Sequence, residues 1–325
     1  MIGRDLLVAK DISTQFPVGP IGWRRKVLTA VDRVDLRIRE GEVLALVGES
    51  GSGKTSLGRT LLRLIEPASG SIQYDGRELV GMNDTELRAL RREMQVIFQD
   101  PFASLDPRMT VSQIISEGLA IHRIGTRAAQ MLRVQEMLTL VGLDPLVGAR
   151  YAHALSGGQR QRVGIARALA IQPRFIVADE AVSSLDVSVQ AQILRVLSDL
   201  RELLGLTMLF ITHNLSVVRI IADRIAVMYL GRIVEIGPTA QVFSQPAHPY
   251  TRLLLASVPM PDPRVRLNWD FPQGEAVSSL VRPVGCAFQA RCPFAIPRCA
   301  EAAPTLVDAG TDHQAACIRV SEIRT

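Results

Sequence analysis

Short apolar runs alternate along this chain with longer stretches in which apolar residues recur three or four positions apart. The short runs predict buried strands, because each is bounded by turn residues and is too short for a helix. The longer stretches predict helices. The predicted strands are residues 43–47, 175–178 and 208–211, and the predicted helices are residues 55–64, 159–170 and 189–204. Strands that alternate with helices indicate an α/β fold with a parallel sheet.

Other stretches add elements to this core. Residues 31–38 largely alternate apolar and polar, which predicts a half-exposed antiparallel strand. Residues 226–230 and 232–236 are typical of a hairpin. Residues 111–141 have helical spacing and no strand signal, with a break at Gly125, so we expect a helical insertion.

The composition shifts near Pro259, where four prolines fall in a segment without helical period. The length of 325 residues suits one large or two ordinary domains. We therefore predict a main domain over residues 5–258, with a helical subdomain at about 100–170, and a C-terminal tail over residues 259–325.

Charge and composition narrow the functional classes only slightly. The net charge of +5 permits anionic partners without choosing among them, and an aromatic content of 5% argues against a base-stacking platform. No apolar run is long enough to span a bilayer, and the first residues have no signal-peptide pattern. We expect a cytoplasmic protein with reduced thiols.

Residues 48–55 fit the phosphate-loop pattern G-x-x-x-x-G-K-[ST] between a predicted strand and a predicted helix. Glycines let backbone N–H groups surround phosphates, and the helix start directs positive charge at the same place. In this pattern Lys54 reaches the β- and γ-phosphates, and the Thr55 hydroxyl binds Mg²⁺. The predicted nucleotide-binding residues are Gly48, Ser50, Gly51, Ser52, Gly53, Lys54, Thr55 and Ser56.

Two carboxylates, Asp179 and Glu180, follow the predicted strand at residues 175–178. A buried strand that ends in a solvated acidic turn would look the same. Together with a phosphate loop, however, the pair favours hydrolysis, with Asp179 holding Mg²⁺ and Glu180 acting as a general base on water.

A third motif, Leu-Ser-Gly-Gly-Gln, precedes the helix at residues 160–170, and Ser156 is its predicted N-cap. A helix start with bare N–H groups also receives phosphate. LSGGQ between GESGSGKT and FIVADE resembles the signature of ATP-binding-cassette ATPases. Gln99 in VIFQDP resembles the Q-loop of that family, Asp186 in SSLD its D-loop, and His213 in FITHN its switch histidine.

The resemblance covers residues 5–258 and implies a cassette fold with an antiparallel β-subdomain and a helical subdomain. It implies that two cassettes form a head-to-tail dimer around two ATP molecules. Ser156 and Gly158, with Gly157, Gln159 and Asp186, would then contact ATP bound to the partner's phosphate loop. His213 would hold the γ-phosphate beside Glu180, and Gln99 would sense Mg²⁺ and signal to a membrane subunit.

Two positions bear on this assignment. The family stacks an N-terminal aromatic on adenine; Phe16 is the predicted residue, with Trp23 as the alternative. Ala181 stands where the family usually has proline, a residue that stiffens the turn without doing chemistry. We therefore expect an active hydrolytic site.

The C-terminal tail indicates which branch of the ATP-binding-cassette family this chain resembles. The segment QPAHPYTRLLLASVP, followed by GCAFQARCPFAIPRC, resembles ATPases of oligopeptide, dipeptide and nickel importers. This resemblance implies two transmembrane permease subunits, a second ATPase of the same or another kind, and indirectly a substrate-binding protein. It implies no nucleic-acid partner and a place at the cytoplasmic face of the cell membrane. The alternative is a soluble cassette ATPase of the DNA-repair or translation type.

Four cysteines are confined to the tail with spacing C-x5-C-x6-C-x17-C, which is neither a zinc-ribbon nor a ferredoxin pattern. In a reducing compartment such clustering favours a metal site over disulfides. We predict that Cys286, Cys292, Cys299 and Cys317 hold a 4Fe–4S cluster, with zinc or unliganded packed thiols as the alternatives.

Overall fold

The computed structural model describes residues 3–19, 26–182, 185–257 and 283–323. The chain divides into two compact units. The first unit comprises Met1–Leu6, Ile38–Glu42 and Gly81–Ile211, and the second comprises Leu7–Arg37, Val43–Val80 and Thr212–Thr325. The proline-rich segment near residue 259 lies outside the described residues, so the domain boundary expected there stays a prediction.

The first unit contains three parallel strands. β6 (Met94–Ile97) pairs with β7 (Phe175–Asp179), and β7 pairs with β8 (Thr207–Ile211). Every residue of β7 and β8 is buried, which explains why both sequences are continuous apolar runs rather than alternating ones. The strands predicted at residues 175–178 and 208–211 are confirmed.

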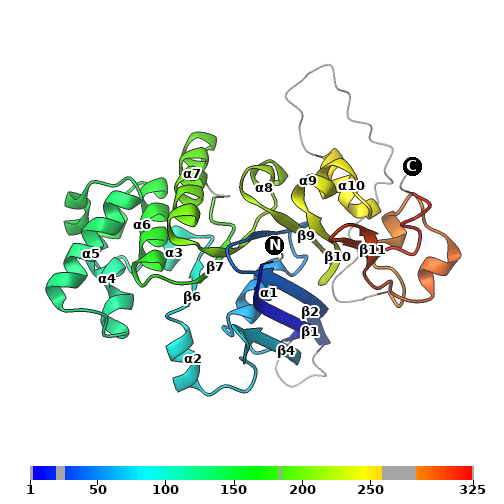
Figure 1. Cartoon of the computed structure of the whole chain (residues 1–325), viewed down its shortest axis with the longest axis horizontal. Helices are drawn as coiled ribbons and strands as arrows, with labels where there is room; N and C mark the ends of the chain where they lie inside the picture. Colours follow the sequence, from blue (N-terminus) through cyan, green and yellow to red (C-terminus); the bar gives the residue numbers. More distant parts are fainter. Residues whose placement is uncertain (1–2, 20–25, 183–184, 258–282, 324–325) are drawn as a thin grey trace. The chain divides into compact units, whose positions relative to one another are not determined.

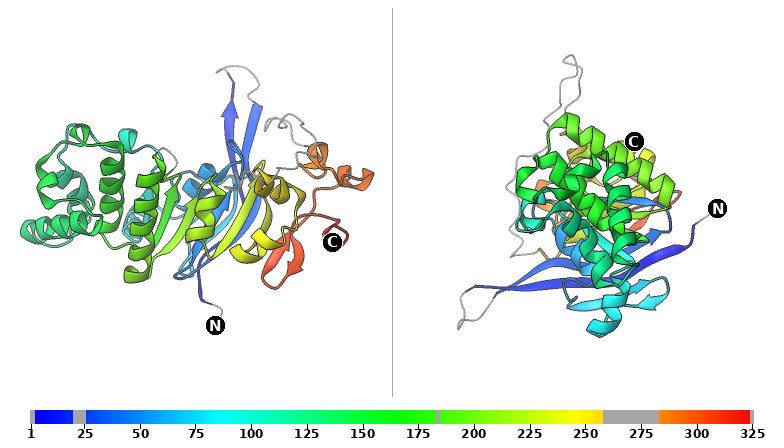
Figure 2. Two further views of the ribbon diagram at one scale, coloured as in Figure 1. Left: turned by 90° about the horizontal axis from the view of Figure 1, so that it is seen from above. Right: turned by 90° about the vertical axis from the view of Figure 1, so that its left-hand side faces the viewer.

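The first unit also contains several helices (Figures 1 and 2). The predicted helical stretch consists of α4 (Val111–Ile121) and α5 (Arg127–Leu140), and both contact α6 (Gly157–Ala170). The predicted break is confirmed: Gly125 has φ +70°, and the Thr126 side chain then caps α5. The other helices are α2 (Asp84–Leu90), α3 (Pro101–Ser104), α7 (Val187–Leu204) and the 3₁₀ turns Pro145–Ala149 and Ala152–Ala154.

The second unit contains a mixed sheet. β3 (Val43–Val47) runs parallel to β9 (Arg224–Tyr229), and β9 pairs antiparallel with β10 (Arg232–Pro238). The predicted hairpin is thus confirmed. Two tail strands that the sequence did not predict, β12 (His313–Ala315) and β11 (Val307–Gly310), extend the sheet beyond β10.

An antiparallel sheet in the order β2-β1-β4-β5 belongs to the second unit except for the first residues of β1 and the last of β2. Its long strands β1 (Asp5–Val18) and β2 (Lys26–Arg39) are blue in Figure 2. The sheet contacts α1 (Lys54–Leu61) through a buried 2.9 Å hydrogen bond between the hydroxyls of Thr14 and Thr60. α1 ends earlier than the predicted residue 64, because Arg63 has φ +52° and leaves the helical conformation. β4 (Ser69–Tyr74) and β5 (Arg77–Glu78) complete the sheet.

The tail adds side chains to the core beside β3. Phe288 is 1% exposed and packs with Tyr229 of β9 and Tyr250 of α10 (Pro249–Ala256), with ring centroids 5.5 and 5.4 Å away. The remaining elements are α8 (Leu215–Ile221), α9 (Thr239–Ser244) and the 3₁₀ turns Gln289–Arg291 and Pro297–Ala300. Among the described residues, no helix has both the length and the apolar character needed to cross a membrane.

A buried polar pair anchors the tail strand β12. His313 Nε2 lies 2.7 Å from a carboxylate oxygen of Glu235 on β10, and the two side chains are 1% and 0% exposed. The same carboxylate accepts hydrogen bonds from the backbone N–H groups of Ala247 and His248, both at 2.8 Å. Glu235 therefore ties the sheet both to the tail and to the segment that begins α10.

We expect Glu235→Ala to destabilise this region by about 3–5 kcal/mol, because it leaves buried partners of a carboxylate unpaired. Hydrogen–deuterium exchange of β12 and α10 should therefore accelerate strongly. Glu301→Ala, at an exposed tail glutamate, is the control and should change little. Equal exchange in the two variants would show that the buried carboxylate does not anchor the tail.

Candidate functional site

The phosphate loop leaves no room for side chains at two of its glycines. Gly48 has φ +155°, and a Cβ there would lie 2.1 Å from the carbonyl oxygen of Met228. Gly53 has φ +104°, and a Cβ there would lie 2.1 Å from the carbonyl oxygen of Ala30. The loop therefore packs its backbone directly against β2 and β9, as the predicted motif requires.

The lysine of the motif lies within its own loop. Lys54 begins α1, is 5% exposed, and its Nζ donates to the carbonyl oxygens of Gly48 and Glu49, each at 2.8 Å. Its Nζ is also 3.3 Å from the Ser52 hydroxyl. A buried ammonium surrounded by loop carbonyls is placed to meet a phosphate that binds in the loop.

Two residues that the sequence did not assign to the site support this loop from outside. The Tyr250 hydroxyl accepts a 2.9 Å hydrogen bond from the Glu49 N–H. Arg291 of the tail donates two hydrogen bonds of 3.0 Å to the Glu49 carboxylate. The sequence signal for Tyr250 is the His-Pro helix start before it, where His248 caps α10 and Pro249 occupies the first turn.

In the first unit, Gln99 and Glu180 meet. The Gln99 Nε2 donates a 2.7 Å hydrogen bond to a carboxylate oxygen of Glu180. Glu180 has φ +46°, and its N–H donates to the carbonyl oxygen of Ile211 at the end of β8. This unusual backbone conformation directs Glu180 out of the line of β7, while Asp179, the last residue of β7, is 2% exposed.

The signature motif starts α6 as predicted. The Ser156 hydroxyl accepts from the Gln159 N–H at 3.3 Å, and the Gln159 side chain accepts from the Ser156 N–H at 3.1 Å, which forms a capping box. A Cβ at Gly158 would lie 2.6 Å from a Val189 methyl on α7, so close helix packing requires glycine there. The exposed Ser156 side chain leaves this helix start open to a ligand.

The other predicted residues are placed as follows. The Asp186 carboxylate accepts hydrogen bonds from the Ser188 hydroxyl at 2.7 Å and from the Val189 N–H at 2.9 Å, which caps α7 and lowers the pKa of Asp186. His213 is exposed and lies just before α8, whereas Phe16 is half-buried near the end of β1. Trp23 and the two serines of the predicted D-loop lie outside the described residues.

The predicted magnesium-binding residues offer oxygen donors, the ligands that Mg²⁺ prefers. The carboxylate of Asp179 is nearly fully buried, and a buried carboxylate is costly unless a cation or several donors compensate it. This burial fits the role predicted for Asp179. Thr55 of the second unit carries a hydroxyl, and Gln99 of the first unit carries an amide oxygen, which are donors of the kind that Mg²⁺ accepts.

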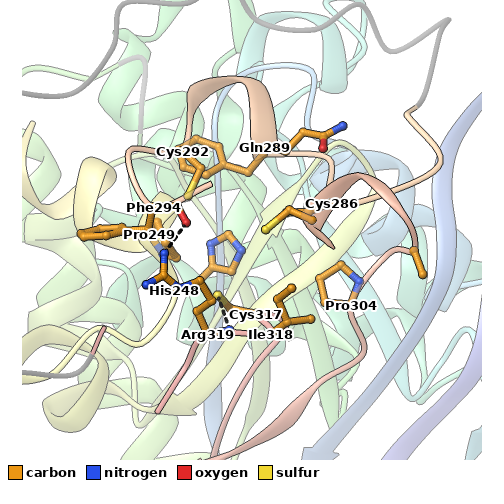
Figure 3. Close-up of a pocket in the computed structure, with 13 residues that line it drawn as sticks. His248, Pro249, Cys286, Gln289, Cys292, Phe294, Pro304, Cys317, Ile318 and Arg319 are labelled. Carbon is orange, nitrogen blue, oxygen red and sulfur yellow. Dashed lines mark hydrogen bonds between the residues drawn. The ribbon is translucent and has the colours of Figure 1, made fainter. Parts of the chain in front are cut away.

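All four cysteines line one cavity of about 20 Å³ in the second unit, together with His248 and Arg319 (Figure 3). Three tail segments and the start of α10 thus converge there, although the four thiols span 32 sequence positions from 286 to 317. The cavity is about large enough for one water molecule. Within the described ranges, no three His, Cys, Asp or Glu side chains are arranged as metal ligands.

Burial controls protonation around this cavity. It raises the pKa of the Cys286 thiol to about 11, and it also raises the pKa of Cys292 and of Cys317. Burial lowers the pKa of His248 to about 4, and its Nδ1 accepts from the Tyr250 N–H. At neutral pH Cys286, Cys292 and Cys317 are therefore neutral thiols beside a neutral imidazole, and a metal would have to displace their protons.

Comparison with known protein families gives two matches in this chain. The family described as "ABC transporter" matches residues 31–183, which contain the phosphate loop, Gln99, Ser156 and the carboxylate pair. The family described as "Oligopeptide/dipeptide transporter, C-terminal region" matches residues 234–299, which contain Glu235, α10 and three of the four cysteines.

Individual relatives match over nearly their whole length. A Brucella ovis protein named as a peptide import ATP-binding protein is 52% identical over 296 residues, covering 91% of this chain and 93% of the relative. The oligopeptide transport ATP-binding protein AppF of Bacillus subtilis is 44% identical over 317 residues, covering 96% of both chains.

Among solved structures, the ATP-binding cassette MJ0796, in a dimeric post-hydrolysis state with ADP and Pi, matches with a TM-score of 0.65 at 29% identity. The match covers 72% of this chain and 98% of that cassette. The expected α/β cassette fold and ATP-hydrolysing activity follow from these matches. The chain belongs to the family of ABC transporter ATP-binding proteins.

Proposed function

We propose that this chain energises the import of peptides or related small solutes as an ATP-hydrolysing subunit at the cytoplasmic face of a membrane. The observation that carries the proposal is that one chain matches both the ABC transporter family and the oligopeptide/dipeptide transporter C-terminal region. The tail match also argues against the alternative, a soluble cassette ATPase of DNA repair or translation. We propose no nucleic-acid partner.

ATP binding is assigned to the phosphate loop and the start of α1. Donors for the β- and γ-phosphates come from the loop backbone, which carries no side chain at Gly48 and Gly53, and from the buried ammonium of Lys54. In the proposed site Thr55, Asp179 and Gln99 hold Mg²⁺, which neutralises phosphate charge when bound. Phe16 or Trp23 is proposed to stack on adenine.

Glu180 is the proposed general base for the attacking water. Its carboxylate already accepts a hydrogen bond from Gln99, which restricts its orientation. Because Gln99 is also a proposed Mg²⁺ ligand, this hydrogen bond would connect the Mg²⁺ ion to the general base. Gln99 is further proposed to signal the nucleotide state to a permease subunit. His213 is proposed to hold the γ-phosphate and position the water.

The exposed start of α6 is proposed to act across a dimer. Its capped N-terminus offers an anion site, and the relative MJ0796 is a dimer with ADP and Pi. We propose that a second cassette, of this or another chain, places its ATP against Ser156, Gly157, Gly158, Gln159 and Asp186. Two transmembrane permease subunits and an extracytoplasmic substrate-binding protein would complete the importer.

We also propose that Cys286, Cys292, Cys299 and Cys317 hold a 4Fe–4S cluster, with a zinc ion as the alternative. The support is their convergence on one cavity and the suitability of four thiolates as cluster ligands. The cavity would have to widen and the thiols to lose their protons as the metal enters.

Glu180→Gln should leave ATP binding intact and lower steady-state ATPase of the assembled transporter by about 10²–10⁴-fold, because it removes the base but keeps the side-chain shape. Nucleotide titration measures ATP binding, and phosphate release measures ATPase activity. Glu202→Gln, on an exposed part of α7, is the matched control and should retain activity. Turnover near wild type in Glu180→Gln would rule out the assigned base.

Ser156→Arg should lower ATPase of the assembled transporter about 10²-fold or more, because it blocks the anion site at the start of α6. The isolated mutant chain should still bind ATP in a filter assay, since its own phosphate loop is unchanged. Ser69→Arg, at an exposed position of β4, serves as the control. Loss of ATP binding by the isolated Ser156→Arg chain would contradict the assignment across a dimer.

Anaerobic purification should yield about four iron and four labile sulfide per chain, the count for a cluster held by four thiolates. Because burial raises the pKa of Cys286 to about 11, reconstitution should improve as pH rises from 6.5 to 8.5. One zinc without sulfide would replace the cluster with a zinc site. Four alkylatable thiols in folded, metal-free protein would leave only a packing role.

A further inference from the structure

Glu49 of the phosphate loop is held at three points, two of them by residues far along the chain. Its N–H donates to the Tyr250 hydroxyl at 2.9 Å, and its carbonyl oxygen accepts from Lys54 Nζ at 2.8 Å. Its carboxylate accepts both Arg291 hydrogen bonds at 3.0 Å. The conformation of this loop residue is therefore set partly by the tail.

The ion pair between Arg291 and Glu49 is partly buried and bidentate, two features that strengthen such a contact. The Arg291 side chain is 14% exposed and that of Glu49 is 35% exposed, so the pair is partly shielded from solvent. A bidentate guanidinium–carboxylate contact fixes both charge and direction. The hydrogen bonds to Glu49 also raise the pKa of the Arg291 guanidinium, a group that is charged at any physiological pH.

The guanidinium is itself fixed by the tail core. Arg291 lies in a 3₁₀ turn that directly follows Phe288, and its guanidinium carbon is 5.7 Å from the centre of the Phe288 ring. Phe288 is buried with the rings of Tyr229 and Tyr250. Cys286 precedes this stretch, and its N–H donates to the carbonyl oxygen of Cys299 at 2.8 Å.

The charge of Arg291 can offset an unfavourable interaction between Glu49 and ATP. A carboxylate in the phosphate loop repels the polyphosphate of ATP unless a cation neutralises it. Arg291 of the tail supplies that cation from outside the phosphate loop. The same contact directs the carboxylate toward Arg291 of the tail.

We propose that Arg291 is a positioning residue for ATP binding: by pairing with Glu49, the cysteine-bearing tail holds the phosphate loop in its binding conformation and neutralises its carboxylate. The tail then acts on nucleotide affinity and not on the chemical step. This inference goes beyond the proposed transport function and does not depend on a metal in the cysteine cavity.

The test measures MgATP affinity of the purified full chain, and KM and kcat of the assembled transporter. Arg291→Gln should raise Kd and KM about 5–10-fold and leave kcat within about twofold, because the loop charge affects binding rather than water attack. Arg291→Lys, which keeps the charge but loses the bidentate contact, should show a smaller rise in Kd. Arg298→Gln, at an exposed arginine of the same tail, should behave as wild type.

A double-mutant cycle with Glu49→Gln makes the test specific. In the Glu49→Gln background, Arg291→Gln should change Kd less than twofold, because the carboxylate that needs neutralising is gone. Wild-type affinity in Arg291→Gln, or an equal loss in both backgrounds, would overturn the proposal.

Loosening of the tail is distinguished by counting thiols that react with a disulfide reagent. The proposal requires Kd to rise in Arg291→Lys while the four thiols remain as protected as in wild type. A rise in Kd that occurs only in variants with newly reactive thiols would assign Arg291 a merely structural role and overturn the proposal.

Discussion

The second unit is organised around a backbone that must remain free of side chains. Gly48 and Gly53 pack against backbone carbonyl groups of β9 and β2, so the conformation of the phosphate loop depends on the positions of those strands. A bare loop has few contacts of its own to hold it. Lys54, Tyr250 and Arg291 provide them, each through a hydrogen bond to Gly48 or Glu49.

Helix starts perform a related task in the first unit. The side chains of Ser156 and Asp186 satisfy N–H groups of their own helices and thereby fix where α6 and α7 begin. The remaining N–H groups at these starts are still available to an anion. A stable helix end and a phosphate receptor are thus the same structure, which is why capping alone does not distinguish the two roles.

The tail is integrated with the nucleotide-binding part of the second unit. Its strand β12 is fixed by the buried contact of His313 with Glu235, and its Phe288 enters the core beside β3. Glu235 also holds the backbone that begins α10, the helix from which Tyr250 reaches Glu49. Polar groups in a low-dielectric core are costly to separate, so these contacts act together.

Local sequence predicts most of the elements outside the tail and the motifs of the candidate site. Apolar runs predict β3, β7 and β8. The phosphate loop, the carboxylate pair and the signature motif are visible in the sequence because adjacent residues define each of them. Only the tertiary structure decided which distant residues meet: Gln99 with Glu180, Glu235 with His313, and Arg291 with Glu49. Such pairs leave no local periodicity, since each partner is an ordinary polar residue until folding removes water from around both.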